Sequence, residues 1–406
     1  MSGVATGAGP PGPLGRAGPV VTGVGVLSAA GRGLAALTEA AAHGKAAFGP
    51  VTRFDVRARR TERAALLPDA LLSGAALPSA PPTSPPASGS GPAPASPAPA
   101  VAVLDAIAQA CHQAGPGATE GTALPVLLAL HSDERTRATV DAVAAGLRAG
   151  RTAAGVSRVY TGACVAAATA VADAAAAVAT GRHERVLVAA VHLVEPGVFA
   201  VFDAGRALAR DGELRPFSAG RTGTLLGDAA AAVVVEAAAA AERRGASVLA
   251  RLAGWGRAGD AHHVCRPEPD GTGVARAIEA ALARAGVAPA EVGYVNANGT
   301  GSPLADLAEA RALRRVFGPH TGHLPVSSSK SVHGHALEAS ALLELAVLVG
   351  ALGTGRLPVN AGWLGPDPDV GLDLVLDGPR TARPAHALSL NSAFGGANTA
   401  LLLAPG

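Results

Sequence analysis

The sequence has few aromatic residues, few cysteines and almost no net charge. Aromatic side chains make up 3% of its 406 residues, and 33 Lys+Arg residues nearly balance 31 Asp+Glu residues. A chain without a basic excess has no broad positive field to attract nucleic acid. The three cysteines, Cys111, Cys164 and Cys265, are spaced neither as a disulfide framework nor as a zinc site. We therefore expect neither a nucleic-acid-binding protein nor a domain held by disulfides or zinc.

Long uninterrupted hydrophobic runs are also missing. Residues Met1–Val20 contain no continuous apolar segment of the kind that a secretory signal requires. The two most apolar windows are Val186–Phe202, which contains Glu195, and Ala341–Leu352, which contains Glu344. Charged residues inside both windows argue against a membrane span. We expect a cytoplasmic protein.

Small apolar residues dominate what is present, and their pattern predicts alternating strands and helices. Residues Pro19–Leu27 are β-rich and precede a helical stretch, Leu34–Ala42. The apolar runs Arg185–Val191 and Ala229–Val235 are typical of strands in a sheet covered on both faces. Other elements are expected at Val101–Ala114 (helix), Leu124–Leu130 (strand), Arg135–Ala149 (helix), Val156–Tyr160 (strand) and Val165–Thr180 (helix). This alternation predicts an α/β layered fold.

The same plan restarts after about residue 246, which predicts an internally duplicated fold with halves 1–245 and 246–406. The second half is expected to contain strands at Val248–Leu252, Val292–Asn296, Ala387–Leu390 and Thr399–Leu403, and helices at Gly273–Ala285, Leu304–Val316 and Leu337–Leu352. One segment of the first half, Leu77–Ala100, is low-complexity Pro/Ser/Ala and predicts an exposed, mostly unfolded loop.

Cys164 lies in the sequence YTGACVAAATA, between an expected strand and an apolar helix. The helix dipole and free N–H groups at such a position stabilise a thiolate, so we expect a lowered pKa for Cys164. A sharp strand-to-helix turn also presents a side chain to substrate, as nucleophile elbows do. The alternative is that Cys164 is a small buried hydrophobic residue.

Three further segments accompany Cys164 and narrow this choice. They read YVNANGTGSPLAD at Tyr294–Asp306, SSSKSVHGHALEASALLE at Ser327–Glu344 and NSAFGGAN at Asn391–Asn398. In order and approximate spacing, these segments and Cys164 resemble the active-site segments of β-ketoacyl synthases. The resemblance covers nearly the whole chain. It implies a duplicated thiolase fold, layered αβαβα.

The resemblance also implies roles for individual residues. Cys164 takes the position of the nucleophile, and His335 that of the second active-site histidine. Phe394 matches a gatekeeper phenylalanine whose backbone N–H would form an oxyanion hole with that of Cys164. Supporting positions are matched by Lys330 and Glu344, and pantetheine-contacting positions by Thr300 and Ser302. Singly, the Lys330–Glu344 pair could be only a structural ion pair, and Thr300 a turn residue.

The departures from the family pattern are informative. Asn298 stands where the family has its first active-site histidine; an amide can donate a hydrogen bond but cannot shuttle a proton. Loss of this histidine resembles ketosynthases that transfer acyl groups without condensing them. Glu338 replaces a glycine three residues after His335, where it either touches the imidazole and raises its basicity or lies on the solvated surface. The short segment between Arg148 and Thr161 puts the family's usual dimer and acyl pocket in doubt.

We therefore expect a ketosynthase-like acyltransferase of polyketide or fatty-acid-like biosynthesis. Cys164 would accept an acyl group from a carrier-protein or coenzyme A thioester, and His335 would act as general base for a hydroxyl, amine or thiol acceptor. The expected partners are an acyl carrier protein and a second ketosynthase-like subunit in a homodimer or heterodimer. No metal or redox cofactor is implied. The alternatives are a decarboxylative condensing enzyme and a non-catalytic chain-length-factor-like subunit, against which the retained Cys164 argues.

Overall fold

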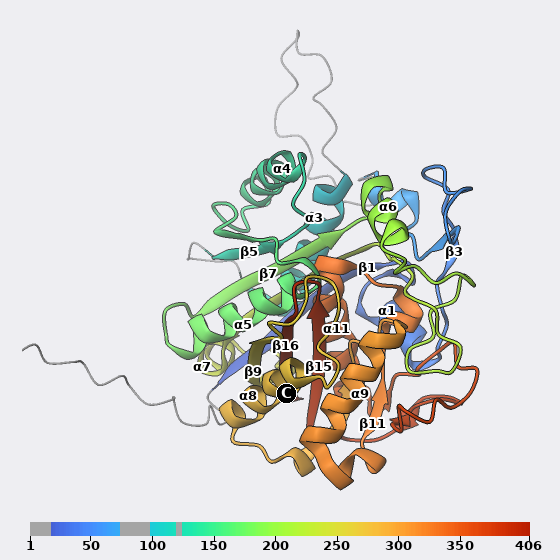
Figure 1. Ribbon diagram of the computed structural model, residues 1–406. Coiled ribbons are helices and arrows are strands. Elements are labelled where there is room, and N and C mark those ends of the chain that lie inside the picture. The colour runs from blue at the N-terminus through green and yellow to red at the C-terminus, as the bar shows by residue number, and fades with distance from the viewer. Residues whose placement is uncertain (1–17, 74–97, 119–123) are drawn as a thin grey trace, which may run out of the picture.

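The computed structural model describes residues 18–73, 98–118 and 124–406 (Figure 1). Residues 1–17 lie outside the described residues, and so do residues 77–97 of the expected loop. The final three residues of that expected loop are helical, because α3 spans Ala98–Ala114 and buries Ala100. The prediction of an unfolded loop is therefore wrong for residues 98–100. Proline is tolerated in the first turn of a helix, so Pro99 does not prevent an earlier start.

The strands of both halves form one mixed sheet, with twelve strands in the described residues. In the first half, the order across the sheet is β1 (Pro19–Ser28), β8 (Ala229–Ala237), β7 (Arg185–His192), β5 (Val126–Ala129) and β6 (Arg158–Tyr160). In the second half it is β9 (Ala250–Gly259), β16 (Ala397–Pro405), β15 (His386–Ala393), β10 (Val292–Asn296), β11 (Pro325–Ser327) and β13 (Asp373–Leu374). The halves join where β1 pairs with β9, at Val20↔Arg251 and Val21↔Ala250.

The two halves repeat one topology, which confirms the predicted duplication. Without the edge strand β13, each half has five of these strands, and numbered along the chain both sets run first, fifth, fourth, second, third across the sheet. In both, the first two pairings are antiparallel and the next two are parallel. The boundary between residues 245 and 246 stays a prediction.

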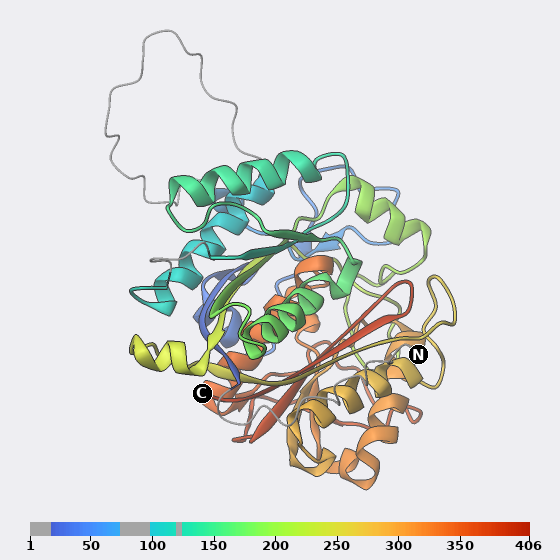
Figure 2. The ribbon, with the colours of Figure 1, turned by 90° about the vertical axis from the view of Figure 1, so that its left-hand side faces the viewer.

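Helices cover the sheet in layers (Figure 2). Helices α5 (Ala166–Ala179) and α11 (Ser340–Thr354) lie together in the largest apolar core, between the two halves of the sheet. Helices α3 and α4 (Thr136–Ala149) cover the outer face of the first half, and α8 (Thr272–Ala285) and α9 (Pro303–Phe317) that of the second. The result is five layers, α-β-α-β-α.

Two equivalent glycines show how closely the outer helices approach the sheet. A Cβ on Gly25 of β1 would lie 1.9 Å from the carbonyl oxygen of Ala106 in α3. A Cβ on Gly256 of β9 would lie 1.9 Å from that of Ala277 in α8. Real Cβ atoms do not come this close, so both contacts require glycine. The duplication is thus visible in equivalent glycine residues as well as in the strand order.

The remaining described elements are short or peripheral. They are α1 (Leu34–Ala42), α2 (Asp69–Leu72), α6 (Pro196–Ala204), α7 (Ala238–Arg243), α10 (Lys330–His333), β2 (Gly31–Arg32), β3 (Gly49–Pro50), β4 (Arg63–Ala64), β12 (Arg356–Leu357), β14 (Arg380–Thr381) and the 3₁₀ turns η2 (Ala163–Val165), η3 (Pro289–Glu291), η4 (Gly318–His323) and η5 (Leu337–Ala339). The stretch Leu337–Thr354 is long and apolar enough to cross a membrane, but 83% of it is buried inside the protein. It is a core helix of the fold.

Candidate active site

Cys164 lies in a strained turn between β6 and α5. The turn is the 3₁₀ segment η2, and Ala163, directly before Cys164, has φ 50°. A non-glycine residue in the left-handed region is uncommon and is found where the surrounding structure holds it. The turn places the side chain of Cys164 in the wall of a cavity of about 130 Å³. The predicted strand–turn–helix arrangement around Cys164 is thus confirmed.

The side chain of Cys164 contacts the imidazole of His335. Its Sγ lies 3.1 Å from Nε2 of His335, while Nδ1 of the same ring lies 3.0 Å from Oγ of Ser340 at the start of α11. When Nδ1–H donates to Ser340, Nε2 is free to accept the thiol proton. The two reactive groups come from the two halves of the chain, 171 residues apart.

Burial sets the protonation of both partners. It raises the pKa of the Cys164 thiol to about 12 and, with the neighbouring ammonium of Lys330, lowers the pKa of His335 well below its ordinary value of 6.5. The expectation of a lowered pKa for Cys164 is therefore wrong, because removal from water outweighs the helix N-terminus. The pair rests as a neutral thiol beside a neutral imidazole, which can take the proton as the sulfur attacks.

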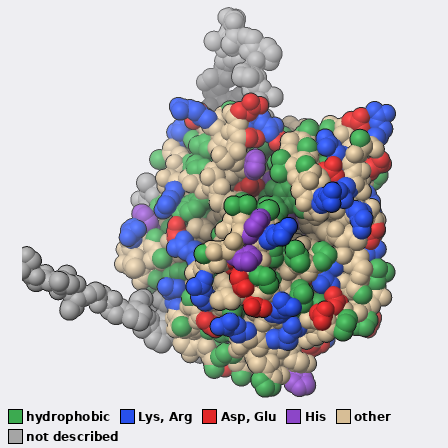
Figure 3. Space-filling model, in the orientation of Figure 1, with side chains coloured by type: hydrophobic (Ala, Val, Ile, Leu, Met, Phe, Trp, Pro, Cys, Tyr) green, Lys and Arg blue, Asp and Glu red, His purple; other side chains and the backbone are tan. Residues whose placement is uncertain are grey.

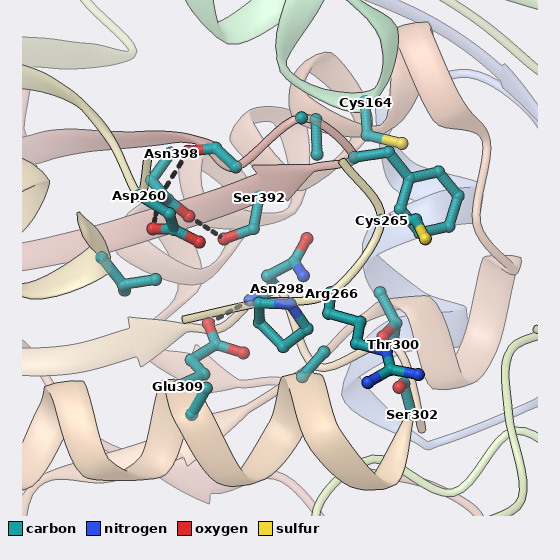
Figure 4. A pocket seen from close by; sticks show the side chains of 18 of the residues that line it. Cys164, Asp260, Cys265, Arg266, Asn298, Thr300, Ser302, Glu309, Ser392 and Asn398 are labelled. Atoms are coloured by element: carbon teal, nitrogen blue, oxygen red, sulfur yellow. Dashed lines mark hydrogen bonds between the residues drawn. The ribbon is translucent and has the colours of Figure 1, made fainter. Parts of the chain in front are cut away.

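Asn298 lines the same cavity and is held by hydrogen bonds of its side chain and backbone. Nζ of Lys330 donates to its Oδ1 over 3.2 Å. Its backbone N–H donates to Oε1 of Glu309 over 2.7 Å (Figure 4), and its carbonyl accepts a longer hydrogen bond from Ser328. Since the amide oxygen is engaged by an ammonium group, the amide NH₂ is the part that a ligand can use. Burial raises the pKa of Glu309 to about 7, although it accepts a second hydrogen bond from the N–H of Gly299.

The predicted Lys330–Glu344 ion pair is present and fully buried. Nζ of Lys330 contacts Oε1 of Glu344, and Oε2 of Glu344 accepts a hydrogen bond from Asn391. Lys330 also reaches Asn298, so the pair connects α11 to the cavity wall. The ion pair therefore directly contacts a residue of the cavity wall.

The remaining predicted residues line the mouth of the cavity. Phe394, in the turn between β15 and β16, is 51% exposed and packs against Phe202, with ring centroids 5.7 Å apart. Thr300 and Ser302 also line the cavity, near Arg266 and at the end of the view away from Cys164 in Figure 4. The structure thus brings Cys164 together with every predicted residue of the site except Glu338, Lys330 and Glu344, of which the last two lie directly behind Asn298.

Glu338 occupies neither of its two expected positions. It is 2% exposed and accepts hydrogen bonds from Nδ1 of His131 over 2.9 Å and from Nδ1 of His192 over 3.2 Å. Burial opposes its ionisation, but the two imidazoles outweigh that effect and hold the pKa of Glu338 below its ordinary value. Both expectations, direct contact with His335 and a solvated position, are wrong because His131, just after β5, and His192, at the end of β7, hold the buried carboxylate.

Four residues of the site and its surroundings were not predicted from the sequence: His131, His192, Ser340 and Glu309. A signal existed for the first two, because each comes directly at or after the end of an expected apolar strand. The strands β5 and β7 are parallel neighbours, and the carboxyl ends of such strands meet at one edge of a sheet. Ser340 and Glu309 act through contacts that periodicity does not indicate.

Comparisons with known proteins agree with this architecture. A family model described as the N-terminal domain of beta-ketoacyl synthase matches residues 19–241, and one described as its C-terminal domain matches residues 249–363. A 3-oxoacyl-[acyl-carrier-protein] synthase 2 of Staphylococcus aureus is 35% identical over 207 residues, which cover 50% of this chain and 51% of that protein. Nodulation protein E of Rhizobium meliloti is 40% identical over 204 residues, half of each chain. The chain spans about half the length of the curated relatives that it matches.

Solved structures match over nearly the whole chain. A type II PKS acyl-carrier protein complex with its ketosynthase (22% identity) and the ishigamide ketosynthase/chain length factor (24% identity) each give a TM-score of 0.83, covering 96% of this chain and 99% and 100% of theirs. A beta-ketoacyl synthase from Burkholderia phymatum gives 0.80 at 25% identity, covering 96% and 99%. The fold is the duplicated α/β thiolase fold, as predicted.

Proposed function

Because this chain belongs to the β-ketoacyl synthase family, we propose that it is an acyltransferase that moves an acyl group from a thioester, through Cys164, to a hydroxyl, amine or thiol acceptor. The observation that carries the proposal is the contact between Sγ of Cys164 and Nε2 of His335 in a cavity wall. The donor would be an acyl carrier protein or coenzyme A thioester. The reaction would take place in the cytoplasm and needs no metal or redox cofactor.

Loading of the enzyme begins with a neutral thiol. As Sγ of Cys164 attacks the thioester carbonyl, the thiol proton moves to Nε2 of His335. The backbone N–H groups of Cys164 and Phe394 would hold the oxyanion, and one such donor is worth about 3 kcal/mol in comparable enzymes. Collapse of the tetrahedral intermediate expels the donor's thiolate, which takes the proton from His335. The acyl group is then bound to Cys164 as a thioester.

Transfer to the acceptor reverses these steps with a new nucleophile. The acceptor's hydroxyl, amine or thiol loses its proton to Nε2 of His335 as it attacks the acyl-enzyme carbonyl. The Cys164 thiolate leaves and recovers a proton from the imidazolium. Thr300 and Ser302 line the cavity and would contact the pantetheine arm of the donor.

Asn298 supports transfer over condensation. Decarboxylation of a malonyl thioester builds negative charge on the thioester oxygen, which a neutral amide stabilises weakly and to which it supplies no mobile proton. A decarboxylative condensing enzyme is the second candidate, favoured by the similarity to the Staphylococcus aureus 3-oxoacyl-[acyl-carrier-protein] synthase 2. A chain-length-factor-like subunit is the third, favoured by the ishigamide complex.

Two solved relatives support the expected partners. One is a ketosynthase bound to its acyl-carrier protein, and the other is a ketosynthase with a chain length factor. We propose two corresponding partners for this chain: an acyl carrier protein that donates the acyl group, and a second ketosynthase-like subunit.

Intact-protein mass spectrometry tests the proposal. Incubation with acyl carrier-protein and coenzyme A thioesters should add the acyl mass at Cys164, and a nucleophilic acceptor should remove it. Labelled carbon dioxide is measured in parallel with malonyl carrier protein. Decarboxylation coupled to chain extension would favour the condensing enzyme, and absence of acylation with every donor would favour the non-catalytic subunit.

A further inference from the structure

A second cavity lies on the other side of the turn that carries Glu338. It has a volume of about 300 Å³ and is lined by His131 and Arg135, by His192 and Glu195, and by apolar residues that include Leu130, Val191 and Leu193. The 3₁₀ turn η5 contacts both η2, which carries Cys164, and β7, which ends at His192. The cavity therefore adjoins the candidate active site without sharing its lining. Figure 3 shows histidine side chains beside a hollow near the centre of one face of the molecule; His192 is buried and is not identified among them.

His192 has an unused nitrogen in this cavity wall. Its Nδ1 faces the carboxylate of Glu338, while Nε2 is buried and has no hydrogen-bond partner among the described residues. An ionised carboxylate only accepts hydrogen bonds, so Nδ1 of His192 carries a proton; in the neutral imidazole, Nε2 is then a hydrogen-bond acceptor. A buried acceptor without a partner is uncommon in native proteins and calls for an explanation.

His131 has the complementary property. Its Nδ1 also donates to Glu338, and that hydrogen bond raises the pKa of the imidazole. This favours the imidazolium, whose Nε2–H is a donor, on a side chain that is 43% exposed. The carboxylate of Glu338 therefore holds one acceptor and one donor in the wall of a single cavity.

The surrounding charges argue against an anionic ligand. The guanidinium of Arg135 is already paired with Asp133 and Glu195. Together with Glu338 and a protonated His131, these groups leave the cavity with a net charge of about −1. A carbonyl group would only accept hydrogen bonds and an ammonium group would only donate them, whereas a hydroxyl group does both.

We infer that this cavity is a second binding site, which takes a hydroxyl group of the substrate between His131 and His192. The inference rests on the proposed acyl transfer, because it assigns the hydroxyl to either the acyl chain or the acceptor. Nε2 of His192 is buried, so the proposal requires the lining to move slightly for a hydroxyl group to reach this atom.

Two experiments on the full-length protein separate these sources. The first compares loading of Cys164 by hexanoyl and 6-hydroxyhexanoyl N-acetylcysteamine thioesters, followed by intact-protein mass spectrometry. The second compares binding of 1,6-hexanediol and its dimethyl ether to Cys164→Ala protein, followed by histidine imidazole resonances. If the hydroxyl comes from the acyl chain, we expect loading to favour 6-hydroxyhexanoyl by about tenfold or more. If it comes from the acceptor, the two thioesters load alike and only the diol shifts the imidazole resonances of His131 and His192.

Three variants complete the design. His192→Phe removes the nitrogen and should abolish the preference for the hydroxyl, whereas His192→Gln keeps an acceptor and should retain part of it. His183→Gln, at an exposed histidine, is the matched control and should retain all of it. The inference is overturned if the hydroxyl gives no advantage in either experiment, or if His192→Phe keeps that advantage. Diol binding that is lost in His192→Phe, without acylation of Cys164 by any thioester, would refute acyl transfer while leaving the hydroxyl site in place.

Discussion

The ammonium group of Lys330 donates a hydrogen bond to the side-chain oxygen of Asn298. Lys330 is itself neutralised by Glu344, so the amide is held by a buried ion pair and not by solvent. The contact fixes which end of the amide faces the cavity. It also means that any residue at position 298 lies beside a positive charge.

Asn298→His should therefore gain malonyl decarboxylation without gaining acyl transfer. The nearby ammonium keeps the introduced imidazole neutral, so that it can donate a hydrogen bond to the developing enolate oxygen. We expect labelled carbon dioxide from malonyl carrier protein to rise above the unmodified protein, which should release little or none. Asn298→Ala serves as the control and should not raise it. Brisk decarboxylation by the unmodified protein would contradict both this prediction and the proposed transfer.

Loading of Cys164 should depend little on pH between 6.5 and 9.0, the ordinary pKa values of the two groups. The pKa of His335 is lowered, so its imidazole remains a neutral base down to well below pH 6.5. The pKa of Cys164 is raised, so the thiol remains protonated well above pH 9.0. We expect the loading rate to vary by less than about twofold across this interval. A rise that follows thiol ionisation near pH 8 would show that a free thiolate, not the thiol–imidazole pair, is the nucleophile.

His335→Ala should slow transfer of the acyl group by about 10²–10⁴-fold, the usual contribution of a positioned general base. Quenched-flow release of a labelled acyl group to the acceptor measures this effect. The matched control is His323→Ala, at an exposed histidine, which should leave the rate unchanged. Equal rates in the two variants would assign His335 a structural role.

Glu338→Gln should lower the free energy of unfolding by about 1–3 kcal/mol, because it replaces a buried carboxylate that two imidazoles hold. The pKa of Glu338 is lowered, so its contribution is present above pH 4.5 and is lost as the pH falls through its native pKa. The pKa of His131 is raised, so its contribution is present below pH 6.5 and is lost as the pH rises through its native pKa.

The loss should therefore be larger at about pH 5.5 than at about pH 8.5 in urea unfolding. Glu184→Gln removes an exposed ion pair with Arg243 and should change stability by less than about 1 kcal/mol at either pH. A loss of the same size in both variants would contradict the buried cluster.

The sequence predicted the fold and the cavity residues because both are encoded locally. The strands and helices follow from short periodic segments, and Cys164, Asn298 and His335 each lie in a distinctive segment. The pKa of Cys164 could not be predicted in the same way. Its local sequence indicates a helix N-terminus, but the burial that raises its pKa comes from residues of both halves.

The surroundings of Glu338 were hidden for a related reason. Its partners His131 and His192 lie 207 and 146 residues away, just after β5 and at the end of β7, two strands that meet only in the folded sheet. Local reasoning could compare Glu338 only with His335, three residues earlier. Long-range pairs of this kind become visible when the strand order is known.

The seam between the repeats has a consequence for how activity is acquired. In the described strands, only Val20↔Arg251 and Val21↔Ala250 connect the two halves of the sheet, and Cys164 and His335 lie on opposite sides of that division. A folding intermediate with one repeat complete would carry a nucleophile without its base, or a base without its nucleophile. Recovery of enzymatic activity would therefore report that the two repeats have packed against each other. During refolding, it should return with the slowest assembly step, after the secondary structure of each repeat has formed.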